Sequence, residues 1–205
     1  YVNILNQNKN IINEFNNSIE ESCSIKKKLI EIDSQIIKII DLIYFCLKSK
    51  KKVFICGNGG SAADSEHISA EFLVRLKPNV NRKPYPIISL TQGVPTITAC
   101  SNDYDYSDIF LRNYQALYSK GDLLICLTTS GNSNNVIKVL KYAILKKNKV
   151  LCFTGQKGGK ISKIKNKNLT TINIKSKTVA RIQETYMFLL HFILEQVEIK
   201  LIKIK

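Results

Sequence analysis

The fold is decided by one stretch of the chain, Val53-Phe-Ile-Cys-Gly-Asn-Gly-Gly-Ser-Ala-Ala-Asp-Ser-Glu-His-Ile-Ser-Ala-Glu71. Its first four residues are apolar and end at a glycine, which is typical of a buried strand. The glycine-rich turn that follows allows positive φ angles and a close approach of the backbone to a ligand. Alanines, which favour helices, come next, and we expect the N-terminus of this helix to offer free N–H groups to an anion.

Strand and helix patterns alternate along the rest of the chain, which predicts an α/β fold, a doubly wound parallel sheet covered by helices on both faces. We interpret residues 1–205 as a single domain. Residues 1–50 form an N-terminal helical pair used in packing or oligomerisation, and residues 51–205 form the α/β core. Beyond the first strand and helix, the predicted strands are 87–90, 123–128, 149–154 and 169–174, the predicted helices are 94–100, 106–118, 134–147 and 179–199, and 101–105 is a polar loop.

Composition restricts the class of protein. No apolar run approaches the roughly 20 residues of a membrane span, and the N-terminus lacks the layout of a signal peptide. The six cysteines show no metal-binding spacing, so we interpret them as reduced and the protein as cytoplasmic. The formal charge of +15 is mostly lysine in a chain rich in Lys, Asn and Ile, so we expect no nucleic-acid partner, although this charge would attract an anionic substrate.

The helix that follows the glycine turn carries an imidazole and a carboxylate. His67 and Glu71 are four residues apart, so both project from one face of that helix, beside the predicted anion site. The alternative is that the glycine turn serves chain geometry alone, as many strand-to-helix turns do.

A second loop repeats this design. Thr128-Thr-Ser-Gly-Asn-Ser133 leaves an apolar strand, contains Gly-Asn and supplies hydroxyls near a helix start. Ligands gather at the carboxyl ends of strands in such sheets, and hydroxyls with backbone amides suit a phosphate ester. The alternative is a helix N-cap, because Ser and Asn are common capping residues.

The final helix carries the second of the two histidines, His191. A histidine in an apolar helix is more often a core residue than a ligand, but Gln183 precedes it on the same helix. Ideal geometry separates the two by about 12 Å of rise and about 80° of rotation. The set His67, Glu71, Gln183 and His191 suits tetrahedral Zn²⁺ and equally suits proton shuttling, and both roles stay open.

Taken together, these motifs resemble the phosphoheptose isomerases of the sugar isomerase (SIS) domain superfamily over nearly the whole chain. The resemblance implies an SIS-type fold, a cytoplasmic homotetramer, and one zinc ion per subunit held by His67, Glu71, Gln183 and His191. It further implies that Glu71 and His191 are catalytic. The residues that carry the resemblance are Gly57-Asn-Gly-Gly-Ser61, His67, Glu71, Ser101-Asn-Asp103, Thr129-Ser-Gly-Asn-Ser133, Gly158-Gly159, Arg181-Ile-Gln-Glu184 and His191. The implied substrate-binding residues are Asn58, Gly59, Gly60, Ser61, Glu71, Asn102, Asp103, Thr128, Thr129, Ser130, Ser133 and Gln183.

The implied reaction converts sedoheptulose 7-phosphate to D-glycero-D-manno-heptose 7-phosphate through an enediol, as the first step toward ADP-heptose for lipopolysaccharide. Glu71 would be the base at carbon and His191 its acid–base partner. The chain departs from the family pattern at Ala180 and Tyr186, where some relatives carry Asp and His. One alternative is a non-catalytic SIS module that binds the replication initiator protein. In such modules, the positions that match Glu71 and His191 carry residues that cannot perform acid–base chemistry. Another is a sugar-phosphate-sensing regulator, for which no separate DNA-binding domain fits.

Overall fold

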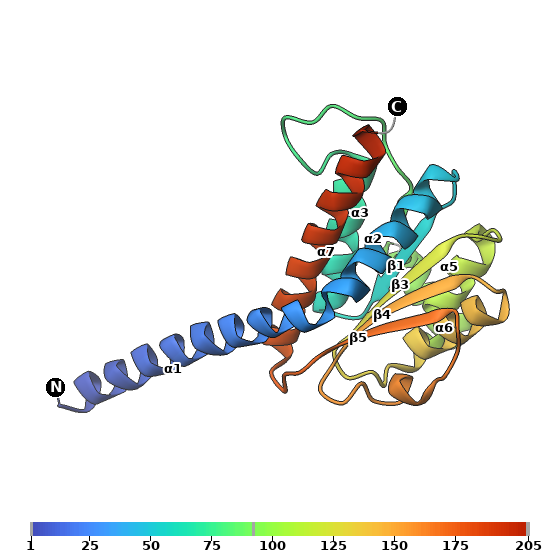
Figure 1. The fold of residues 1–205 in the computed structure, drawn as a ribbon. Helices are drawn as coiled ribbons and strands as arrows, with labels where there is room; N and C mark the ends of the chain where they lie inside the picture. The colour runs from blue at the N-terminus through green and yellow to red at the C-terminus, as the bar shows by residue number, and fades with distance from the viewer. Residues whose placement is uncertain (1, 92, 204–205) are drawn as a thin grey trace.

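Five parallel strands form a sheet in the computed structural model, which describes residues 2–91 and 93–203 (Figure 1). The strand order is β2-β1-β3-β4-β5, and every neighbouring pair is parallel. β1 and β3 are buried along their whole length, as expected for strands covered on both faces. The strands are β1 (Val53–Gly57), β2 (Ile87–Ser89), β3 (Leu123–Thr128), β4 (Lys149–Gly155) and β5 (Leu169–Ile174).

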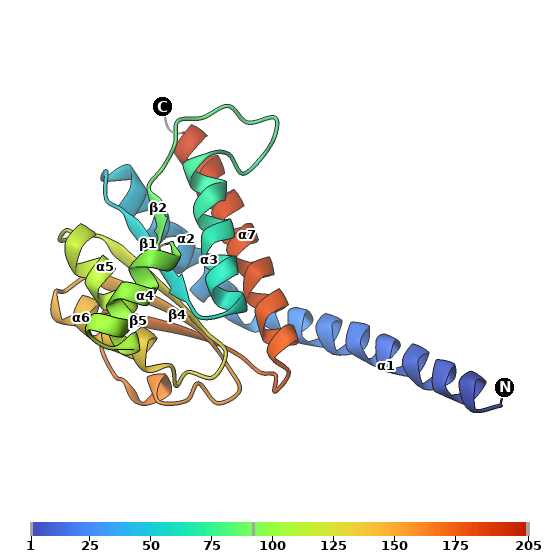
Figure 2. The ribbon, with the colours of Figure 1, turned by 180° about the vertical axis from the view of Figure 1, so that it is seen from behind.

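Helices cover both faces of the sheet, which confirms the predicted doubly wound architecture (Figures 1 and 2). Successive residues of β1 point to opposite faces. Val53 and Ile55 join the core under α2 (Asp33–Lys48), α3 (Gly60–Leu73) and α7 (Val179–Lys203), whereas Phe54 and Cys56 join the core under the other helices. The helices of this second face are α4 (Val94–Asp103), α5 (Ile109–Leu117) and α6 (Asn134–Leu145), and short 3₁₀ turns lie at η1 (Lys28–Ile32), η2 (Tyr106–Asp108) and η3 (Ile161–Lys163).

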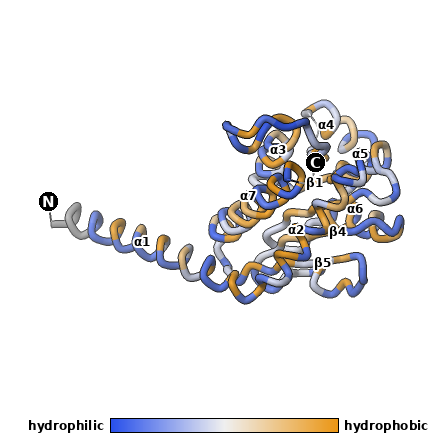
Figure 3. The backbone as a smooth tube through the Cα atoms, turned by 45° about the horizontal axis from the view of Figure 1, so that its top comes forward, coloured by the Kyte–Doolittle hydropathy of each residue, from blue (hydrophilic) through white to orange (hydrophobic). Residues whose placement is uncertain are grey.

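The predicted N-terminal helical pair is present, but its first member projects away from the body. α1 (Val2–Lys27) forms a long arm joined to α2 through η1 (Figure 1). Its base is fixed where Arg181 Nη1 donates to the Ser18 carbonyl at 2.9 Å. Apolar residues recur along the arm (Figure 3), and four of them stay exposed by 47–64%: Ile11, Ile12, Phe15 and Ile19.

The structure tests two further sequence predictions, the loop at residues 101–105 and the state of the cysteines. The prediction of a polar loop at residues 101–105 is wrong for its first three residues, because α4 continues through Asp103 before the chain turns. All six cysteines are free, and Cys56, Cys126 and Cys152 are buried strand residues, as predicted. Among the described residues, none of the helices has the length and apolar character needed to cross a membrane.

Candidate active site

The glycine turn lies at the carboxyl end of β1 and leads directly into α3. Gly59 has a φ angle of +57°, a backbone conformation that residues with a side chain rarely adopt. At Gly60 a Cβ would lie 2.6 Å from Gln183 Nε2, so the absence of a side chain lets the amide of α7 approach the first turn of α3. The predicted close approach therefore exists at this turn, and its partner in the structure is a side chain of the same chain.

The predicted free N–H groups at the start of α3 are present in part. Ser61 N donates to the Asn58 carbonyl at 3.0 Å and Ala62 N to the Gly59 carbonyl at 2.9 Å, whereas the 3.2 Å bond from Ala63 N to the Gly59 carbonyl is the first regular bond of the helix. The turn carbonyls thus satisfy two donors that a helix start normally leaves unpaired, and the N–H groups of Gly59 and Gly60 make no hydrogen bond among the described residues. The sequence could not show this, because it depends on the φ and ψ angles of the turn.

The second loop, residues 128–133, presents its hydroxyls differently. Ser130 is exposed and Ser133 is half-buried, and the Ser133 hydroxyl lies 3.3 Å from Thr128 Oγ1. Although Ser133 is the N-cap residue of α6, its side chain makes no capping hydrogen bond. The capping alternative for Ser133 is therefore wrong, and its hydroxyl is positioned beside Thr128.

A third loop supports the second. A Cβ at Gly131, where φ is +66°, would lie 2.1 Å from the Gly158 carbonyl oxygen, and a Cβ at Gly159 would lie 2.3 Å from the Ser130 oxygen. Lys160 N also donates to Asn132 Oδ1 at 2.9 Å. This close backbone contact explains why glycines stand at positions 158 and 159, and it holds the second loop in place.

Asn135 and Tyr106, which the sequence analysis does not single out, bond to the glycine turn. The side-chain amides of Asn58 and Asn135 exchange hydrogen bonds of 2.9 and 2.8 Å, and the Tyr106 hydroxyl donates to Asn58 Oδ1 at 3.1 Å. Asn135 lies at the start of α6, so this amide pair ties the glycine turn to the second loop. A polar residue in the first turn of a helix was the available signal, and it resembles an ordinary capping residue.

Asn102 and Asp103 lie in the last turn of α4 and are exposed. Asn102 Nδ2 donates to Asp103 Oδ1 at 2.8 Å. Asp103 also lines a cavity of about 330 Å³ together with Cys100 and Arg112. The residue of this region that reaches the glycine turn is Tyr106, three positions beyond Asp103.

The two histidines, 124 residues apart in the chain, meet at the surface between α3 and α7. His67 Nε2 lies 3.1 Å from His191 Nε2 and 3.3 Å from Glu71 Oε1. Ligand atoms of the three residues all lie within 4.8 Å of one another. His191 is therefore half-buried beside Glu71, not packed in an apolar interior, and one subunit alone brings the three side chains together.

The hydrogen bonds of this cluster favour a cation at its centre. His191 Nδ1 lies 2.9 Å from the Met187 carbonyl, which only accepts, so Nδ1 carries the proton and Nε2 offers a lone pair. His67 Nε2 thus faces two acceptors and has at most one proton to share between them. Tetrahedral zinc bonds of about 2.0–2.1 Å place ligand atoms about 3.4 Å apart, and the 3.1 and 3.3 Å separations are close to that spacing. The donor set fits Zn²⁺.

Gln183, the fourth member of the predicted set, lies two turns before His191 on α7. Its amide lies over Gly60, about 10 Å of helical rise before His67 on the neighbouring helix, so within one subunit the structure does not bring it to the other three residues of the predicted set. Next to it, the buried Tyr186 hydroxyl lies 2.7 Å from Ser61 Oγ and 2.8 Å from Asp64 Oδ2. Burial is the largest cause that raises the pKa of Tyr186 above its usual value, so this phenol stays neutral.

Comparisons with known proteins define the class of this fold and site. The family model described as "SIS domain" matches residues 14–155, so the chain carries an SIS domain. Phosphoheptose isomerases from Shewanella halifaxensis and Shewanella sediminis are each 37% identical over 188 residues, covering 92% of this chain and 93% of each relative.

Solved structures agree. A phosphoheptose isomerase from Neisseria gonorrhoeae superposes with a TM-score of 0.82 at 31% identity, covering 94% of this chain and 98% of that chain. One from Francisella tularensis gives a TM-score of 0.85 at 30% identity, covering 91% and 97%. The chain belongs to the phosphoheptose isomerase family of SIS-domain proteins, and it is an isomerase acting on a sugar phosphate. The non-catalytic alternatives find no support among these relatives.

Proposed function

We propose that this chain interconverts sedoheptulose 7-phosphate and D-glycero-D-manno-heptose 7-phosphate, the first step toward ADP-heptose for lipopolysaccharide. One observation carries the proposal: His67, Glu71 and His191 converge between α3 and α7, and α3 begins at the glycine turn, which the Asn58–Asn135 pair joins to the second loop. The names of the relatives support the heptose substrate over other sugar phosphates.

The proposed mechanism divides the two proton transfers between Glu71 and His191. Glu71 takes the proton from the hydroxyl-bearing carbon next to the carbonyl and returns it to the neighbouring carbon, so an enediol lies between ketose and aldose. His191, whose Nε2 offers a lone pair, moves the proton between the two substrate oxygens. One zinc ion per subunit, held by His67, Glu71 and His191, would supply charge stabilisation for the enediolate oxygens. Gln183 of the same subunit lies over Gly60, too far along α7 to join them.

The second loop is the proposed phosphate site. Thr128, Thr129, Ser130 and Ser133 supply hydroxyls and amides there, and the exposed Ser130 is the most accessible of them. The sugar would lie toward the glycine turn and the end of α4, against Asn58, Gly59, Gly60, Ser61, Asn102, Asp103 and Gln183. The role of the Ser61 hydroxyl in phosphate binding stays a prediction, because in the structure that hydroxyl pairs with Tyr186.

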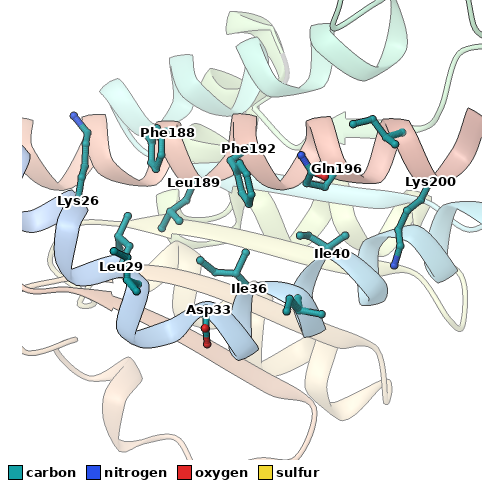
Figure 4. Close-up of a pocket in the computed structure, with 13 residues that line it drawn as sticks. Lys26, Leu29, Asp33, Ile36, Ile40, Phe188, Leu189, Phe192, Gln196 and Lys200 are labelled. Carbon is teal, nitrogen blue, oxygen red and sulfur yellow. The ribbon is translucent and has the colours of Figure 1, made fainter.

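We propose that the protein assembles as a homotetramer in the cytoplasm. A groove of about 580 Å³ runs between α2 and α7, where Phe188 and Phe192 face Ile36 and Ile40 (Figure 4). The α1 arm carries its own exposed apolar residues and points away from this groove (Figure 1). A second copy of the chain would supply a partner for both surfaces at once. Six free thiols suit a reducing compartment.

The test is an isomerase assay with sedoheptulose 7-phosphate, with and without a chelator, on wild-type protein and on Glu71→Gln and His191→Gln. We expect turnover in the wild type, and a loss of about 10²–10⁴-fold in kcat in each variant because acid–base catalysis is removed. Unchanged circular dichroism would show that the fold is intact. Full turnover in both variants contradicts the mechanism, and active protein that contains no zinc contradicts the proposed role of the zinc ion.

A further inference from the structure

The buried hydroxyl of Tyr186 connects the two helices that carry the proposed catalytic residues. It lies on α7, three residues after Gln183, so both side chains share one face of that helix. Opposite them, Ser61 and Asp64 are three residues apart near the start of α3. The hydroxyl bridges that pair at 2.7 Å from Ser61 Oγ and 2.8 Å from Asp64 Oδ2.

The direction of each hydrogen bond follows from donor chemistry. A carboxylate accepts and does not donate, so the Tyr186 O–H donates to Asp64. The phenol oxygen then accepts the proton of Ser61, whose side chain is itself buried. The single proton of Ser61 is thus directed toward α7, away from any ligand at the second loop.

We infer that Tyr186 is a positioning residue for the active site. By holding Ser61 and Asp64, it fixes the start of α3 against α7. The same two helices bring His67 and Glu71 to His191, so the bridge keeps these three side chains together. This inference rests on the proposed function, because the three side chains are proposed zinc ligands. Tyr186 touches neither the substrate nor the ion in this role.

The experiment measures zinc affinity by titration against a competing chelator, on protein first stripped of metal. Tyr186→Phe removes the whole bridge and Asp64→Ala removes its acceptor, and we expect the dissociation constant of zinc to rise about 10- to 100-fold in each, as for other groups that orient metal ligands. Asp64→Asn keeps an oxygen that accepts from Tyr186 and should retain wild-type affinity. The matched control is Tyr114→Phe, since Tyr114 is equally buried but its hydroxyl accepts from Asn148 on the other face of the sheet.

Hydrogen–deuterium exchange of the metal-free protein separates this inference from the proposed function. We expect faster exchange at residues 60–64 in Tyr186→Phe and unchanged exchange there in Tyr114→Phe. Zinc affinity in Tyr186→Phe equal to that in Tyr114→Phe overturns the inference, whatever the exchange rates. Wild-type protein that neither binds zinc nor isomerises the substrate overturns the proposed function instead, and the exchange comparison alone then decides whether Tyr186 fixes the turn.

Discussion

The loops at residues 57–61 and 128–133 are similar in sequence and different in structure. Both follow a buried strand, contain Gly-Asn and end in a serine. In the first, Asn58 pairs with Asn135, and Ser61 is buried with its hydroxyl bonded to Tyr186. In the second, Ser130 is exposed, its hydroxyl accepts a local bond from Asn132 N, and Ser133 makes no capping bond.

The difference indicates a division of labour. The first loop is a rigid support that starts α3, and α3 carries His67 and Glu71. The second loop offers hydroxyls whose partners can be exchanged for those of a ligand. Similar loop sequences therefore do not imply equal contacts with the substrate, and the following predictions test this division directly.

The largest expected effect concerns the far end of α3. Arg82 donates to the carbonyls of Glu71 and Phe72 at 2.8 and 3.0 Å, and its Nε lies 2.6 Å from Glu198 Oε1 on α7. Both charged side chains are at most 3% exposed. Glu198→Ala leaves the arginine buried without its partner, so we expect the free energy of unfolding in urea to fall by about 3–5 kcal/mol.

The control for that prediction is Asp108→Ala, which breaks the more exposed pair with Lys138 and should cost about 0.2–1 kcal/mol. Equal losses in the two variants would mean that the Arg82–Glu198 pair does not anchor α3, and the idea of a rigid first loop and helix would lose its main support.

Sequence predicted the strands, their parallel arrangement, and the pairing of His67 with Glu71, because these depend on periodicity and local spacing. It could not place His191 beside His67, since that contact requires the packing of α7 on α3. In the sequence, Tyr186 is only a departure from the family pattern, and Arg82 only begins the stretch Arg82-Lys-Pro-Tyr-Pro86, which is typical of a turn. Their roles arise from hydrogen bonds between segments over 100 residues apart.

The hydroxyls of the two loops provide the next test. Ser130→Ala should weaken binding of the doubly charged phosphate, because a hydrogen bond to a charged group contributes about 1.5–3 kcal/mol, or roughly 10- to 150-fold in KM. Ser61→Ala should change KM by less than about threefold and lower unfolding stability by about 1 kcal/mol, since its hydroxyl already pairs with Tyr186. Steady-state kinetics and urea unfolding measure both. An equal rise of KM in the two variants would erase the distinction between the loops.

The last comparison concerns two of the glycines of positive φ, Gly59 and Gly131. Alanine at either position costs about 1–3 kcal/mol in backbone strain. At Gly131 the new Cβ would also lie 2.1 Å from the Gly158 oxygen, whereas among the described residues no atom lies within 4 Å of a Cβ at Gly59. Gly131→Ala should therefore lose about 1–3 kcal/mol more in urea unfolding than Gly59→Ala, through overpacking. Gly59 faces open space where a sugar would lie, so Gly59→Ala should instead raise KM, and a larger stability loss there would show that the first loop is the more tightly packed of the two.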